Sequence, residues 1–183
     1  MARDAPSREL PPADWVTDLI RKFQDQLTSG LYEAIYQLDP PNVQKLMHAQ
    51  AHTCSGAFLD LGLLPRTLSL DEFLRRMAIA GPSKIDIARD GNTIRWTEQH
   101  HQGQCACPFV KREVIRLDPK LCICGAQWVK LLFKRVADTD VDVEIGDTVA
   151  TGAPNCCFRI TIKGSSSIAA TPSSTACPGT KQA

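Results

Sequence analysis

Apolar positions in the first half of the chain recur with the period of a helix. After Asp14 they fall at three- and four-residue spacing up to Gly30, which predicts one face of a helix: Trp15, Leu19, Ile20, Phe23 and Leu27. A short helix is expected over 31–38, before the prolines at 40 and 41, and a third helix ends at Gly62. Ser69 and Glu72 have the spacing of a capping box and predict a fourth helix up to Gly81-Pro82.

The period changes to two in the second half of the chain. Residues 85–87 and 94–96 alternate apolar and polar positions around Asp90-Gly91, which is typical of a β-hairpin. A helix is expected after Gly125, and two further strands over 141–145 and 156–162. On the last strand, alternation places Cys156 on the dry face with Phe158, and Cys157 on the other face.

These elements predict an α+β fold, with a helical N-terminal half packed on a mostly antiparallel sheet that carries a C-terminal helix. We expect a single domain over 13–163. Residues 1–12 end in two prolines and are expected to form a mobile lead-in. Residues 164–183 are rich in Ser, Thr, Pro, Gly and Ala and are expected to form a disordered tail.

Composition narrows the function classes. The chain has 183 residues and a net charge of +1, with the basic residues scattered, so neither nucleic acid nor an anionic membrane is an expected partner. No apolar run reaches the ~20 residues of a membrane span. The charged N-terminus lacks the apolar core of a secretory signal, which favours the cytoplasm. In that reducing compartment the 8 cysteines indicate metal ligands or reactive thiols rather than disulfides.

Two C-x-C pairs carry the candidate chemistry: Cys105 with Cys107, and Cys122 with Cys124. Four converging thiolates complete a tetrahedral shell for zinc, or less favourably for an iron–sulfur cluster. Pro108 and Gly125 directly follow the pairs and predict turns, where metal-binding loops often lie. Cys156 is a fifth candidate ligand. A reactive thiol and inert packing remain the alternatives, and packing is the favoured role of Cys54, on the apolar face of its helix.

Two histidines precede the cysteines. His100 and His101 end the hairpin and are candidates for a metal ligand or a general base, because imidazole titrates near neutrality. A solvated loop is the alternative for both. His48 and His52, four positions apart on a predicted helix, are expected at the edge of the core rather than on a metal.

The segment 148–160, TVATGAPNCCFRI, resembles the close of two families of small bacterial proteins. It is similar to the G-x-x-x-C-x-F element of the 4-vinyl-reductase domain, and to the close of the L-2-amino-thiazoline-4-carboxylic acid hydrolases. The first resemblance implies a structural zinc beside a pocket for a small aromatic effector. Cys124 and Cys156 match ligand positions, Glu144 is a further candidate, and Thr148 stands where a ligand cysteine is expected.

The second resemblance implies the opening of a cyclic amidine by water, through a metal-bound water or a thiolate. The sequence therefore predicts a hydrolase of a small cyclic C=N or amide substrate. Cys107 and Cys124 are the expected reactive or ligating sulfurs, and His100 or His101 the proton carrier. The alternative is a zinc-thiolate module that binds a small molecule without catalysis. A homodimer remains open.

Overall fold

The computed structural model describes residues 14–62, 64–80, 83–100 and 104–164. The expected lead-in over 1–12 and all but the first residue of the expected tail lie outside this range. The elements, in chain order, are α1 (Trp15–Tyr36), α2 (Pro40–Asp60), α3 (Leu70–Ala80), β1 (Lys84–Asp90), β2 (Thr93–Gln99), α4 (Pro108–Lys111), α5 (Leu121–Ala137), β3 (Val141–Ile145), the 3-10 turn η2 (Val149–Thr151) and β4 (Asn155–Ile162).

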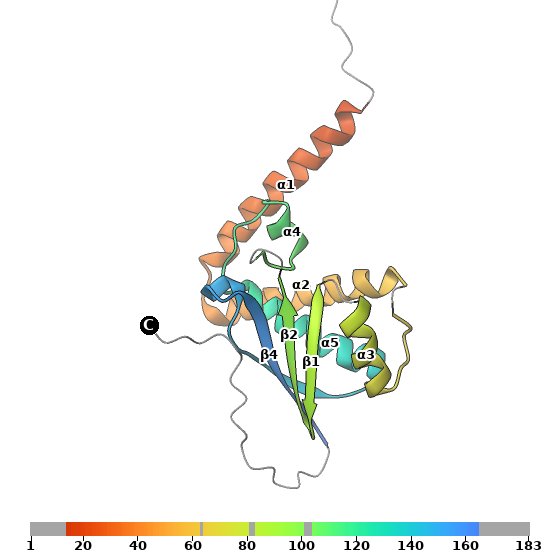
Figure 1. The fold of residues 1–183 in the computed structure, drawn as a ribbon. Coiled ribbons are helices and arrows are strands. Elements are labelled where there is room, and N and C mark those ends of the chain that lie inside the picture. The colour runs from red at the N-terminus through yellow and green to blue at the C-terminus, as the bar shows by residue number, and fades with distance from the viewer. Residues whose placement is uncertain (1–13, 63, 81–82, 101–103, 165–183) are drawn as a thin grey trace, which may run out of the picture.

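The predicted α+β fold is confirmed, with N-terminal helices packed on an antiparallel sheet (Figure 1). The sheet has four strands in the order β1-β2-β4-β3, and all neighbours are antiparallel. The hairpin turn lies one residue later than expected. Asp90 still pairs with Thr93, so the two loop residues are Gly91, with φ of 56°, and Asn92. Glycine is favoured at this position because it has no Cβ that opposes a positive φ.

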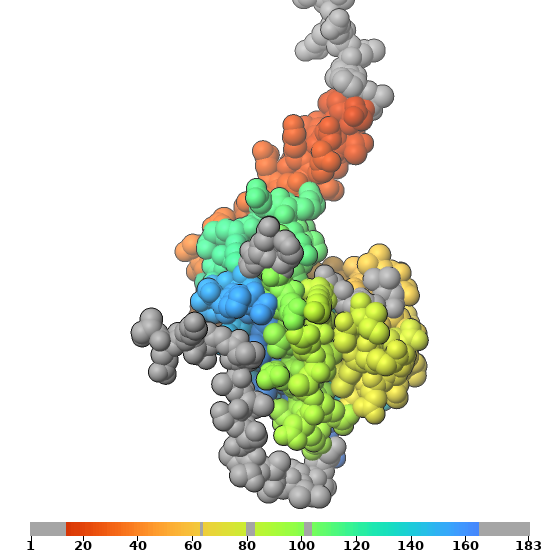
Figure 2. Space-filling view, viewed as in Figure 1, coloured from red at the N-terminus to blue at the C-terminus, as the bar shows by residue number. Residues whose placement is uncertain are grey.

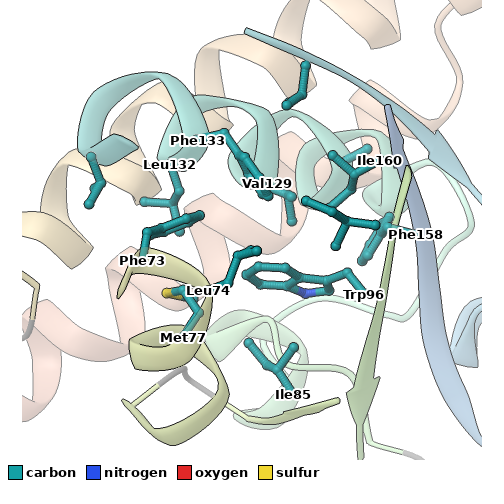
Figure 3. Close-up of a cluster of buried hydrophobic side chains, with 14 of the residues drawn as sticks. Phe73, Leu74, Met77, Ile85, Trp96, Val129, Leu132, Phe133, Phe158 and Ile160 are labelled. Atoms are coloured by element: carbon teal, nitrogen blue, oxygen red, sulfur yellow. The ribbon is translucent and has the colours of Figure 1, made fainter. Parts of the chain in front are cut away.

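The core lies between the sheet and the helices α3 and α5 (Figure 3). Trp96 of β2 is fully buried at its centre, and Phe73 and Phe133 approach it from the two helices. The rings of Phe73 and Phe133 meet edge to face at 5.0 Å, a favourable aromatic geometry. The predicted capping box of α3 is half formed. Glu72 donates its backbone N–H to the Ser69 hydroxyl, while its carboxylate binds Arg75 and Arg76 instead.

Two helix boundaries differ from the sequence-based prediction. The expected break at Gly30 is absent, and α1 runs through it as one helix to Tyr36. Pro40 and Pro41 begin α2 instead of ending the helix before it. The Asp39 side chain accepts the Asn42 backbone N–H at 3.2 Å, and proline is favoured in a first helical turn because that turn lacks N–H acceptors.

A second buried cluster joins the C-terminal end of α1 to α2, α5 and the segment after α4. Its buried members are Tyr32, Ile35, Tyr36, Val43, Met47, Val114, Ile115 and Leu121. Within the described part of the chain, the N-terminal part of α1 belongs to neither buried cluster and projects from the other elements (Figures 1 and 2). Among the described residues, no helix combines the length and apolar character that crossing a membrane requires.

Candidate thiol site

Six free cysteines gather where the N-terminal end of α5 meets α2, β4 and the segment before α4: Cys54, Cys105, Cys107, Cys122, Cys124 and Cys156. Their thiols lie close enough to alter one another's pKa. Both Cys105 and Cys107, for example, raise the pKa of Cys124. The structure therefore brings both C-x-C pairs to one region, as the sequence analysis expects. Cys157 follows Cys156 on the opposite face of β4 and is buried. It takes part in a disulfide bond, so the expectation of thiols rather than disulfides is wrong for this cysteine.

The second C-x-C pair lies on a helix and not in a turn, which corrects the sequence-based prediction. Cys122 and Cys124 both belong to the first turns of α5, and Gly125 is also helical. Residues two apart on a helix point to different sides, so the two sulfurs face different neighbours. Gly125 has a packing role here, because a Cβ at this position would lie 3.4 Å from Cζ of Phe158 on β4.

The first group of thiols consists of Cys54, Cys107 and Cys124. A hydrogen bond joins the sulfurs of Cys54 on α2 and Cys124 on α5, and Gln50 Nε2 donates to Cys54 Sγ at 3.1 Å. Cys54 is therefore a polar partner in the site, whereas the sequence analysis favours inert packing for it. Tyr32 lies close by, and its pKa is raised by burial and by the negative charge that Cys107 and Cys124 can carry.

The hydrogen bond between the two sulfurs decides which of them ionises. It lowers the pKa of Cys54 to about 6, and the bond from Gln50 adds to this effect. The same hydrogen bond raises the pKa of Cys124, and burial raises it further. Burial also raises the pKa of Cys107. Cys54 is thus the thiol of this group that ionises most readily, while the pKa of each of the two sulfurs expected to react is raised.

The second group of thiols consists of Cys105, Cys122 and Cys156. Cys122 donates to Thr148 Oγ1 at 3.4 Å, and the Val149 N–H donates to Cys156 Sγ at 3.5 Å. The start of η2 therefore holds two sulfurs from α5 and β4 in one place. Burial raises the pKa of all three thiols, that of Cys156 to about 12.

A buried carboxylate belongs to this second group. Glu98 of β2 is opposite Cys156 in the strand register and is only 8% exposed. Its Oε1 accepts a hydrogen bond from Trp96 Nε1 at 3.2 Å. Burial raises the pKa of Glu98, although the Trp96 bond and the positive charge of Lys111 act in the opposite direction. When ionised, Glu98 in turn raises the pKa of Cys105 and Cys156.

His100 lies beside Glu98 and is not a solvated loop residue. Its side chain is 2% exposed, and its Nε2 is 3.8 Å from Glu98 Oε2, too far for a hydrogen bond. This nitrogen is buried and has no hydrogen-bond partner among the residues that the structure describes. Burial lowers the pKa of His100, and Lys111 lowers it further, so the ring is held neutral. His101, the other expected candidate, lies outside the described residues.

The site contains side chains that can bind a metal, namely thiols and an imidazole, but they do not lie in the positions of a coordination shell. Within the described ranges, no three His, Cys, Asp or Glu side chains converge as a ready-made metal site. The split between the two faces of α5 is the reason that Cys105, Cys107, Cys122 and Cys124 do not form one four-thiolate cage. The second group fits zinc in donor type, since it combines three thiols with a neutral imidazole whose Nε2 lacks a partner.

One residue of this site, Glu98, is not among the sequence-based candidates, and one candidate, Glu144, lies elsewhere. Glu98 continues the alternation of Ile94 and Trp96, so its inward direction is visible in the sequence. Its proximity to cysteines depends on strand pairing. Glu144 is exposed and pairs with Arg159 at 3.6 Å, which removes it from the candidate ligands. His52 is also exposed, and its Nδ1 lies 3.0 Å from Arg135.

Comparison with protein-family models finds no match for this sequence, and comparison with curated proteins finds none either. The function is accordingly inferred from the site itself.

Proposed function

We propose that this chain is a zinc-thiolate module, with Cys105, Cys122 and Cys156 as sulfur ligands and His100 as the fourth. The observation that carries the proposal is the buried Nε2 of His100, which has no hydrogen-bond partner among the described residues and lies beside Glu98, the carboxylate that acts on Cys105 and Cys156. A buried polar atom without a partner costs about 1–3 kcal/mol of folding free energy, which a ligand bond at that atom would offset. Glu98 lies close enough to His100 to serve as the fourth ligand in its place, through a carboxylate oxygen, or to orient the His100 ring.

The resemblance to the 4-vinyl-reductase domain supports Cys156 as a ligand, although it also implies Cys124, which the proposed set leaves out. Thr148 occupies the position where that family leads us to expect a ligand cysteine, and Cys122 donates a hydrogen bond to its hydroxyl. The Cys122 sulfur can therefore replace the missing one. Three thiolates and one imidazole complete a closed tetrahedral shell, which is typical of structural zinc. This closed shell favours a module that binds a small molecule over a metal-dependent hydrolase.

Metal analysis of purified protein tests the proposal. We expect one zinc per chain in the wild type, and a loss of affinity of at least about 100-fold after Cys122→Ser combined with Cys156→Ser. Cys54→Ser is the matched control and is expected to retain the metal. Cobalt substitution should add the intense sulfur-to-metal absorption of thiolate ligation in the wild type and in Cys54→Ser, but not in the double variant. Absence of zinc from the wild type, or equal loss in the control, would contradict the ligand set. Iron with a broad visible absorption would indicate a cluster instead.

A specific observation supports a second candidate function, a thiolate-dependent hydrolase. Cys54 has a pKa of about 6, so its sulfur is ionised at neutral pH and can add to the carbon of a C=N or amide bond. This proposal transfers the nucleophile from Cys107 and Cys124 to Cys54. We infer a cytoplasmic location for either function, because the six free thiols of the site suit a reducing compartment, although the disulfide bond of Cys157 is unusual in one.

Thiol alkylation distinguishes Cys54 from its neighbours. At pH 7 we expect iodoacetamide to modify Cys54 faster than Cys107 or Cys124, by about 10-fold, because only Cys54 is largely thiolate. Peptide mass spectrometry after short exposures measures the three rates. Ring opening of small cyclic amidines that Cys54→Ser abolishes would establish the hydrolase. Turnover that persists in this variant would exclude Cys54 as the nucleophile.

A further inference from the structure

The N-terminal part of α1 carries a continuous row of exposed apolar side chains. Seven of them are between 45% and 64% exposed, and together they form the apolar stripe: Trp15, Val16, Leu19, Ile20, Phe23, Leu27 and Leu31. The stripe begins at the first residue of α1 and ends where Tyr32 enters the second core cluster. This part of the helix stands clear of the rest of the molecule (Figure 2).

The helix directs its polar side toward the domain and its apolar side away from it. Asp25, on the opposite side from Phe23, forms an ion pair with Arg112 at 2.8 Å, and Thr28 and Ser29 are half-buried. An ordinary surface helix buries its apolar stripe and exposes its polar one. This reversed orientation leaves apolar side chains in contact with water, which is unfavourable in an isolated monomer. Large contiguous apolar patches on a protein surface typically mark interaction surfaces.

We propose that the apolar stripe of α1 pairs with the same stripe of a second copy of this chain, in an antiparallel dimer. The stripe is self-complementary about Phe23, because Leu19 and Leu27 lie equally far on either side of it, as do Trp15 and Leu31. A two-fold interface needs this property, since the same surface must serve both partners.

Helix geometry specifies the contacts of such a pair. With 3.6 residues per turn, an antiparallel crossing at Phe23 brings Leu27 against the partner's Ile20, and Leu31 against the partner's Val16. On the other flank, Trp15 meets the partner's Gly30. Gly30 is a suitable position for a large indole, because a Cβ built there meets nothing within 4 Å in its own chain.

The available area matches a stable dimer. Side chains of this size that are about half exposed offer roughly 100 Å² each, so a pair of stripes would bury on the order of 1,400 Å² in total. This value lies within the range of specific protein interfaces. The interface would be almost entirely apolar, as in obligate homodimers, and we expect dissociation only at micromolar concentration or below.

Sedimentation velocity of the full chain between about 1 and 100 µM tests the proposal. The wild type is expected to be dimeric in the upper part of this range, and Phe23→Glu to be monomeric throughout, with an unchanged far-UV circular dichroism spectrum because Phe23 is 64% exposed. Thr17→Glu is the matched control. It adds the same charge to an exposed position beside the stripe and is expected to remain dimeric.

A second variant tests the register. Gly30→Met should stabilise the helix itself, since glycine is a poor helix former. It should nevertheless raise the dissociation constant of the dimer at least about 10-fold, because the methionine side chain would occupy the space where Trp15 of the partner subunit packs. A wild type that stays monomeric at 100 µM, or a dimer that survives Phe23→Glu, would overturn the proposal. A monomer whose stripe binds vesicles of phosphatidylcholine and phosphatidylglycerol would overturn it in favour of a membrane surface.

Discussion

Replacing Glu98 with Gln is expected to stabilise the metal-free protein at pH 8 by about 1–3 kcal/mol, the range for an uncompensated buried polar group. Burial raises the pKa of Glu98, so the folded chain retains a proton that the unfolded chain, with a pKa near ~4.3, has released. Stability that is fully present below the unfolded pKa is therefore lost as the pH rises through the folded pKa. Glutamine keeps the shape, still accepts the Trp96 hydrogen bond, and cannot ionise.

Urea unfolding at pH 4, 6 and 8 in the presence of a chelator measures this effect. The wild type is expected to lose stability over this range relative to Glu98→Gln, and the two proteins should converge near pH 4. Glu144→Gln is the matched control, since Glu144 is exposed on the outer face of the sheet and its substitution should leave the pH profile unchanged. If the free energies of unfolding of the wild type and Glu98→Gln changed in parallel with pH, ionisation of Glu98 would not destabilise the fold, and the prediction would be wrong.

The same substitution separates a structural role from a functional one. If Glu98 orients His100 or binds the metal, Glu98→Gln should weaken zinc binding while it stabilises the metal-free fold. A residue retained only for packing would not show opposite effects on stability and affinity. This comparison requires zinc titrations of the wild type and the variant at one pH.

Trp96→Phe is expected to lower the free energy of unfolding by about 2–4 kcal/mol. Trp96 is fully buried between Phe73 and Phe133, so the smaller ring leaves a cavity. The substitution also removes the N–H that donates to Glu98, and hydrogen bonds to charged groups contribute about 1.5–3 kcal/mol. The loss should be larger at pH 8 than at pH 4, because the Trp96 bond lowers the pKa of Glu98.

A double-mutant cycle isolates the contribution of the hydrogen bond. In the Glu98→Gln background, Trp96→Phe should still lower the free energy of unfolding through the cavity, but the loss of the hydrogen bond should matter less because residue 98 is uncharged. The expected coupling free energy between residues 96 and 98 is about 1 kcal/mol at pH 8. Trp15→Phe provides a matched control on the exposed part of α1, where a change within about 0.5 kcal/mol is expected in dilute, monomeric protein. Additive effects at residues 96 and 98 would contradict the proposed link between them.

The sequence by itself determined where most helices and strands lie and which strand positions face the helices. The four-residue spacing of apolar positions specified α1, and the alternation on β2 and β4 specified which side chains face the helices. Such local patterns are sufficient because burial requires one apolar face per element, whatever its neighbours. The cysteine pairs also lie in the region where the described free thiols gather.

Only the tertiary structure decided which groups meet there. Strand pairing places Glu98 opposite Cys156, and the packing of α2 on α5 joins Cys54 to Cys124. These contacts connect residues far apart in the chain, and no local spacing encodes them. Helix geometry at the start of α5 then separates Cys122 from Cys124, so a motif that suggests one four-thiolate site becomes two groups of different chemistry. The same applies to α1, whose amphipathic pattern predicts a buried stripe, because only the position of the domain on its polar side leaves that stripe exposed.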